Sequence, residues 1–206
     1  MGGKKRLLPA LASSFGQKRA WLLAVWFLVS PALLPLAKAA EPLTLAEFAA
    51  RPQGQILFMR HALAPGGGDP PDFALRNCAS QRNLDATGRA QAAAIGKALA
   101  AAGIQPDLIA SSQWCRCLET ARLLGLGPVM ELDGLNSFFQ NIVPRKETLA
   151  KLRAQIDQLP EGQLALMVTH FVTIQAITGL AVGSGEMVVY DRKSGAARPL
   201  ILESSR

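Results

Sequence analysis

Side chains that bind transition metals are scarce in this 206-residue sequence, which holds two histidines and three cysteines. His61 and His170 lie far apart in the chain, and neither is accompanied by a cluster of cysteine or aspartate. A structural zinc site needs about four such ligands close together. We therefore expect neither a metal nor a cofactor.

Three familiar signatures of phosphate chemistry are also missing. The glycine run 66–68 is not followed by the Gly-Lys-Ser/Thr of a nucleotide-binding loop. Cys117 and Arg122 are one residue too close for a Cys-x5-Arg loop, and the sequence has no Asp-x-Asp pair. These absences argue against nucleotide-binding, cysteine-phosphatase and aspartyl-phosphate chemistry.

Most of the positive charge lies at the start of the chain. The net charge is +7, but six of the 22 basic residues fall within residues 1–39, which leaves 16 basic residues against 15 acidic ones. A nearly neutral domain lacks the charged surface that binds nucleic acid. No nucleic-acid partner is expected.

The beginning of the chain is typical of a secretory signal peptide. A basic stretch precedes the apolar run 20–36, and Ala37-Lys38-Ala39 supplies small residues at cleavage spacing. An uncleaved membrane anchor is the alternative, but the run is 17 residues long and contains Pro31 and Pro35. A stable span needs about 20 apolar residues, which favours cleavage. We expect a signal peptide at 1–39, a domain at 40–206, and a periplasmic or secreted protein that leaves the membrane after cleavage.

Export would place the three cysteines in an oxidising compartment, where one disulfide could form. Cys115 and Cys117 are too close on an expected helix to face each other. Cys78 could pair with either of them. Three buried thiols are the alternative, and the sequence leaves both readings open.

Short apolar runs alternate with helical patterns through the rest of the chain. Strands are expected at 55–59, 107–110, 128–132 and 163–169, with a terminal pair at 187–190 and 200–202. Helices are expected at 85–102, 113–124, 146–159 and 172–180, and the long loop 62–84 is typical of a functional segment. This alternation predicts an α/β three-layer sandwich with a largely parallel central sheet.

Polar residues follow several of the expected strands. His61, Ser111, Asp133 and His170 lie at or just beyond strand ends, where sheets of this kind bind ligands. Arg60 precedes the first histidine, and Arg116 follows the second expected strand. Arginine binds phosphate through two parallel hydrogen bonds, and nearby guanidiniums favour a neutral, nucleophilic imidazole. The pattern predicts a cage for one phosphoryl group.

Four segments in chain order resemble motifs of the histidine phosphatase superfamily, which has the phosphoglycerate mutase-like fold. They are Arg60-His61-Ala62, 83–92, 111–121 and Val168-Thr169-His170. The resemblance implies that His61 is the nucleophile, and that Arg60, Arg116 and His170 bind phosphate. It also implies a phosphohistidine intermediate.

The resemblance is incomplete at two places. Ala62 replaces the usual glycine, and Phe171 stands where one branch of the family has an acidic residue. The other branch takes its proton donor from a glutamate after the third strand. Asp133 lies nearest that strand end and is the expected donor, while Glu131 should sit deeper along the strand.

The sequence thus predicts an exported, metal-independent phosphomonoesterase. Its expected partner is a phosphorylated small molecule or envelope glycan, because the chain resembles phosphatases acting on heptose phosphates of the lipopolysaccharide core. A family member that binds phosphoglycans without turnover is one alternative, and a phosphoryl mutase is another. The oligomeric state is left open.

Overall fold

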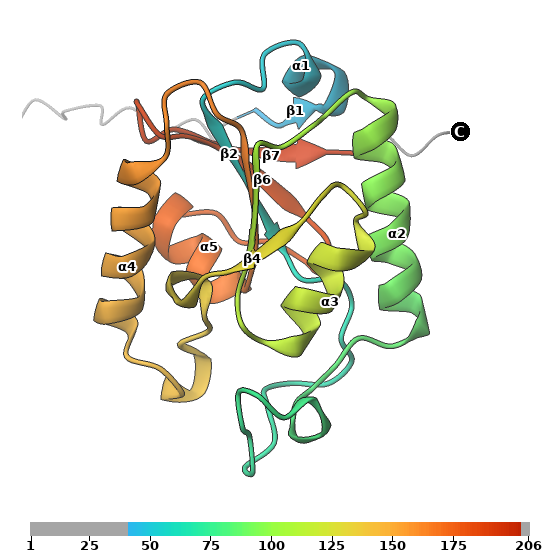
Figure 1. Cartoon of the computed structure of the whole chain (residues 1–206), viewed down its shortest axis with the longest axis vertical. Helices are drawn as coiled ribbons and strands as arrows, with labels where there is room; N and C mark the ends of the chain where they lie inside the picture. The colour runs from blue at the N-terminus through green and yellow to red at the C-terminus, as the bar shows by residue number, and fades with distance from the viewer. Residues whose placement is uncertain (1–40, 203–206) are drawn as a thin grey trace, which may run out of the picture. The chain divides into compact units, whose positions relative to one another are not determined.

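A computed structural model describes residues 41–202 (Figure 1), so the expected signal peptide lies outside the described residues. The strands are β1 (Leu43–Thr44), β2 (Gln55–Arg60), β3 (Leu108–Ser111), β4 (Val129–Glu131), β5 (Ala165–Thr169), β6 (Met187–Asp191) and β7 (Ala197–Ile201). The α-helices are α1 (Leu45–Ala49), α2 (Ala86–Ala101), α3 (Cys115–Leu123), α4 (Arg145–Gln158) and α5 (Phe171–Thr178). Three 3-10 turns are η1 (Cys78–Ser80), η2 (Asp133–Leu135) and η3 (Phe139–Asn141).

Within residues 41–202, one seven-stranded sheet has the order β1-β7-β6-β2-β5-β3-β4. β6 runs antiparallel to both of its neighbours, β2 and β7, and every other neighbouring pair is parallel. This confirms the largely parallel sheet. β6 and β7 form the terminal pair that the sequence indicated, whereas the short elements α1 and β1 were not predicted.

Helices cover the sheet on both faces (Figure 1), and the alternation of side chains along β2 shows why. Leu57 and Met59 pack in the core under α2 and α3. Ile56 and Phe58 point to the other face, into the core under α4 and α5. Because successive strand residues face opposite ways, an apolar run buried on both sides produces the three layers.

Contacts with helix α2 hold the segment that follows β2 in place. Asp85, where the sequence predicted the helix to begin, caps it by accepting a hydrogen bond from Gly88 N at 2.7 Å. A Cβ atom at Gly88 would lie 1.9 Å from the carbonyl oxygen of Leu63, so only glycine permits this approach. Gln91 Oε1 also accepts from Leu63 N at 2.9 Å. The start of the loop after β2 is thereby held against α2.

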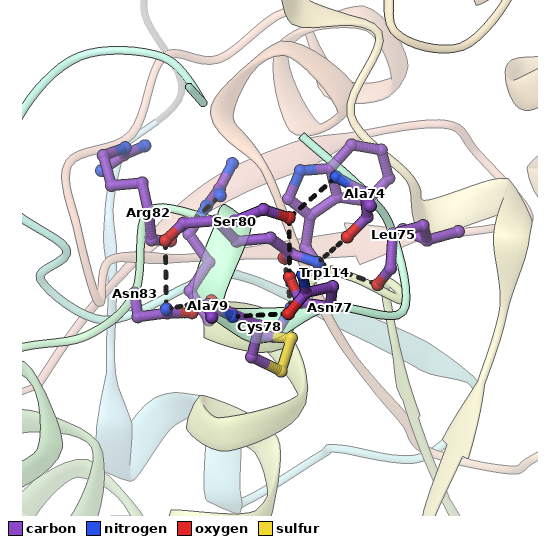
Figure 2. The surroundings of a disulfide bond; sticks show 12 residues. Ala74, Leu75, Asn77, Cys78, Ala79, Ser80, Arg82, Asn83 and Trp114 are labelled. Atoms are coloured by element: carbon purple, nitrogen blue, oxygen red, sulfur yellow. Dashed lines mark hydrogen bonds between the residues drawn. A yellow bond between two sulfur atoms is a disulfide. The ribbon is translucent and has the colours of Figure 1, made fainter. Parts of the chain in front are cut away.

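The loop 62–84 is tied to the start of α3 by a disulfide between Cys78 and Cys115 (Figure 2). Gln81 Oε1 accepts from Cys115 N at 3.0 Å, and the Phe73 ring stacks on Trp114 with centroids 5.0 Å apart. Cys117 is a buried free thiol. The predicted disulfide is therefore confirmed, with Cys115 as the partner of Cys78. The alternative of three free thiols is wrong.

Removing this disulfide should destabilise the domain. A cross-link of this kind contributes about 2–4 kcal/mol by restricting the unfolded chain. We expect the Cys78→Ser/Cys115→Ser double variant to unfold at lower urea concentration than the oxidised wild type. Wild type treated with reductant is the matched control and should unfold with the variant. Equal midpoints for oxidised wild type and variant would contradict this expectation.

The described residues include no helix that is both long enough and apolar enough to cross a membrane.

Candidate active site

The two histidines meet because their strands are neighbours in the sheet. Arg60 at the end of β2 pairs in register with Thr169 at the end of β5, and His61 N donates to Thr169 O at 2.9 Å. The residue after each strand is a histidine, and the two rings lie with centroids 5.5 Å apart. Both side chains are almost fully buried, with 1% of His61 and 2% of His170 exposed.

Arg116 lies in the first turn of α3 and contacts both histidines. Its Nε donates to His61 Nε2 at 3.2 Å, and its Nη2 lies 3.5 Å from His170 Nδ1. Nη1 and Nη2 also donate to the two carboxylate oxygens of Asp69, at 2.7 and 3.1 Å, and Nη1 to the Arg82 carbonyl at 3.2 Å. A guanidinium has five N–H groups, and these five contacts use all of them.

The hydrogen bonds of His61 select one tautomer. Nδ1 lies 2.8 Å from the Ala62 carbonyl oxygen, which can only accept, so Nδ1 carries the proton. Nε2 then presents a lone pair toward Arg116. Burial and the positive charge of Arg116 lower the pKa of His61 to about 3. The ring is thus neutral at ordinary pH, with its nucleophilic nitrogen turned toward a cation.

His170 is held in the opposite tautomer. Its Nε2 lies 2.9 Å from Ser112 Oγ, which in turn donates to Asn136 Oδ1 at 3.2 Å. The network therefore assigns the proton to Nε2 and leaves Nδ1 facing Arg116. Burial, followed by the charge of Arg116, lowers the pKa of His170 well below its usual value. Asn136 was not identified from the sequence, although it lies three residues after Asp133.

Cys117 fills the space beside His170. Its Sγ lies 3.4 Å from His170 Nε2, and burial raises the pKa of the thiol to about 12. The side chain is thus a neutral packing group rather than a thiolate nucleophile.

Arg60 borders the histidine pair and is half-buried. Its Nη1 donates to the Val182 carbonyl at 3.0 Å, and its guanidinium carbon lies 5.3 Å from the centre of the Phe171 ring. Burial and the charge of Arg116 lower its pKa. The buried Nε has no hydrogen-bond partner within residues 41–202.

Arg82 is a third cation near the site that sequence reasoning missed. Its Nε donates to the Gly68 carbonyl at 2.9 Å, and its Nη1 donates to the Ala64 carbonyl. Burial and the charge of Arg116 lower its pKa, and its own charge acts on both site histidines. The length of the loop 62–84 was the available signal, but it pointed to no single residue.

The structure does not bring Asp133 to the histidine pair. The 3-10 turn η2 begins at this residue, and its carboxylate, which is 46% exposed, accepts from Lys151 Nζ of α4 at 2.6 Å. Glu131 lies 3.5 Å from Gln113 Nε2 and is also exposed. Asn136 is the residue of this segment that contacts the site, through Ser112. The buried carboxylate that does contact the site residues is Asp69.

Both imidazoles should remain neutral far below the usual histidine pKa of about 6.5. The protein is prepared without a histidine tag, so that only its two histidines give imidazole ¹⁵N signals. The signals of His61 should show no titration between pH 7 and 4.5. The unfolded chain gains protons below pH 6.5 and the folded domain does not. The free energy of unfolding should therefore decrease as the pH is lowered below about 6.5, by up to about 1.4 kcal/mol per pH unit for each histidine. A His61 midpoint near 6.5, assigned with the His61→Asn variant, would contradict this.

Comparison with protein families gives one match. Residues 56–138 match the model described as histidine phosphatase superfamily (branch 1). This range includes Arg60, His61 and Arg116, and it ends before His170. No curated protein matches the chain.

Solved structures show the same fold at low sequence identity. An Escherichia coli K-12 protein provisionally assigned as an alpha-ribazole-5'-P phosphatase is 18% identical, with TM-score 0.54, 73% of this chain and 96% of that chain covered. A mycobacterial glucosyl-3-phosphoglycerate phosphatase is 19% identical, with TM-score 0.50, 74% of this chain and 100% of that chain covered. Residues 56–138 are thus similar to the histidine phosphatase superfamily, and the described residues share the fold of these solved structures.

Proposed function

We propose that the chain is an exported, metal-independent phosphomonoesterase that works through a phosphohistidine on His61. The observation that carries the proposal is the neutral, buried His61 ring, whose Nε2 lone pair faces the Arg116 guanidinium. A nucleophile of this kind needs no further base, because its proton is already on Nδ1. The surrounding cations supply the positive charge that a metal would otherwise provide.

In the first step, His61 Nε2 attacks phosphorus and the bond from phosphorus to the ester oxygen breaks. The leaving oxygen departs with the bonding electron pair and takes up a proton from a solvent water molecule. Arg116 is drawn from the histidine nitrogens onto the phosphoryl oxygens, which its Nε and Nη2 can grip in parallel. The Nε of Arg60, which has no partner among the described residues, donates to a further oxygen. His170 lies against the same Nε/Nη2 edge of Arg116 as His61.

In the second step, a water oxygen attacks the phosphorus of phosphohistidine. The bond between Nε2 and phosphorus breaks, its electron pair returns to Nε2, and inorganic phosphate leaves. The hydrogen bond from Nδ1 to the Ala62 carbonyl holds the ring in place through both steps. His61 ends in the tautomer in which it began.

The substrate that we propose is a phosphorylated sugar of the cell envelope. This part of the proposal rests on the resemblance to heptose-phosphate phosphatases and on the signal peptide expected at 1–39. The Cys78–Cys115 disulfide is compatible with it, because disulfides persist in exported proteins.

Labelling tests the nucleophile. Mature protein quenched with neutral detergent during turnover of a ³²P-labelled phosphoester, in buffer with EDTA, should carry acid-labile, base-stable label. The His61→Asn variant should carry none, and its thermal midpoint should show that it is folded. Label on serine, cysteine or aspartate would contradict the mechanism, as would a strict need for added metal. Phosphoester binding without label or phosphate release would favour the non-catalytic alternative.

The placement of Asp133 on Lys151 predicts that it is not the proton donor, contrary to the sequence-based expectation. A general acid contributes roughly 100-fold or more when the leaving group is poor, and far less when it is good. Asp133→Asn should therefore slow sugar-phosphate and nitrophenyl-phosphate hydrolysis by the same small factor. Selective loss on the sugar phosphate alone would restore Asp133 as the donor.

A further inference from the structure

We propose that Asp69, on the loop 62–84, is the residue that positions Arg116 for phosphoryl transfer. This inference rests on the proposed function and adds a residue to its machinery. The carboxylate and the guanidinium form a bidentate pair at 2.7 and 3.1 Å, and each side chain is 3% exposed. Such a pair fixes the plane of the guanidinium as well as its position.

The two edges of the guanidinium have different partners. Asp69 occupies the edge formed by Nη1 and Nη2, while Nε and the second hydrogen of Nη2 point to His61 and His170. The edge that would grip a phosphoryl group beside His61 therefore stays clear of the carboxylate. Asp69 thus binds the Nη1/Nη2 edge of Arg116, and the Nε/Nη2 edge remains directed toward His61.

Asp69 is itself held by groups from three segments. Its Oδ2 accepts from Trp114 Nε1 at 3.0 Å, and its Oδ1 accepts from Arg82 N at 3.2 Å. The side chain of Gln140, in η3, binds both the N–H and the carbonyl of Asp69, at 2.7 and 3.3 Å. Gln140 has a φ of 60°, a left-handed conformation that a residue other than glycine adopts only when its surroundings enforce it. The carboxylate thus has a fixed position before any ligand arrives.

The same contacts argue against Asp69 as the proton donor. Both of its oxygens accept hydrogen bonds from N–H groups, which requires the ionised form. Burial would raise the pKa of Asp69, but the hydrogen bonds and charge of Arg116 outweigh it and hold the pKa below its usual value. A leaving oxygen near His61 would also lie on the far side of the guanidinium from this carboxylate.

The first experiment replaces Asp69 by asparagine in the mature, oxidised protein. Misplacing a catalytic group by about 1 Å costs on the order of 100-fold in rate, so kcat/KM should fall by about that factor, with most of the loss in kcat. Because the residue acts through Arg116 and not on the leaving group, nitrophenyl phosphate and a sugar phosphate should lose equally. Asp72→Asn, an exposed position on the same loop, is the matched control and should leave kcat/KM unchanged.

The second experiment is a double-mutant cycle. Arg116→Ala should cause a large loss by itself, and adding Asp69→Asn to it should change kcat/KM by less than about 2-fold, because the positioned group is gone. Trp114→Phe replaces the indole by a smaller aromatic ring and removes one donor to Asp69. It should cause a smaller loss, roughly 2- to 10-fold, as expected for one hydrogen bond. This variant also tests the link if Asp69→Asn does not fold.

Several outcomes would overturn the inference. Independent losses from Asp69→Asn and Arg116→Ala would show that Asp69 does not act through Arg116. A loss confined to the sugar phosphate would make Asp69 the proton donor. Faster turnover, or tighter inhibition by inorganic phosphate, would mean that the carboxylate competes with phosphate. Failure of the proposed function is distinguishable, because wild type would then form no phosphohistidine.

Discussion

One buried guanidinium connects the two histidines of the candidate site with the loop 62–84. Arg116, in α3, contacts His61 and His170, and the Asp69 carboxylate neutralises its charge. A buried cation without a partner would be strongly destabilising, because no interaction would offset the free-energy cost of removing it from water. The arrangement of the loop 62–84 therefore affects both stability and chemistry, since that loop supplies the counter-charge. The low pKa of His61 has the same origin, because burial and the neighbouring cation both disfavour the imidazolium.

The rest of the fold serves to keep that contact in register. The parallel pairing of β2 with β5 brings the two histidines to the same edge of the sheet, although they are far apart in the chain. The Cys78–Cys115 disulfide joins the loop to the residue just before Arg116. Trp114, which precedes that disulfide, stacks on Phe73 of the loop and donates to Asp69. The consecutive residues Trp114, Cys115 and Arg116 thus bind the Asp69 carboxylate, fasten the loop and contact the nucleophile.

The features set by local periodicity could be predicted from the sequence. Apolar runs ending in His61 and His170 indicated buried strands, and Asp85 indicated the start of a helix that the structure confirms. Features that depend on how a loop folds back could not be predicted. The pairing of Asp69 with Arg116 spans 47 positions through a loop with no periodic pattern. The choice of Cys115 over Cys117 depends on which face of α3 meets that loop, and a 3-10 turn directs Asp133 toward α4 while Asn136 reaches the site.

The most direct test of this account is a crystal structure of the mature protein with orthovanadate, which adopts the five-coordinate geometry of phosphoryl transfer. Vanadium should lie at bonding distance from His61 Nε2, with Nε and Nη2 of Arg116 on its oxygens. Asp69 should remain on the Nη1/Nη2 edge of the same guanidinium. Vanadate bound away from His61, or in the place of the Asp69 carboxylate, would contradict it.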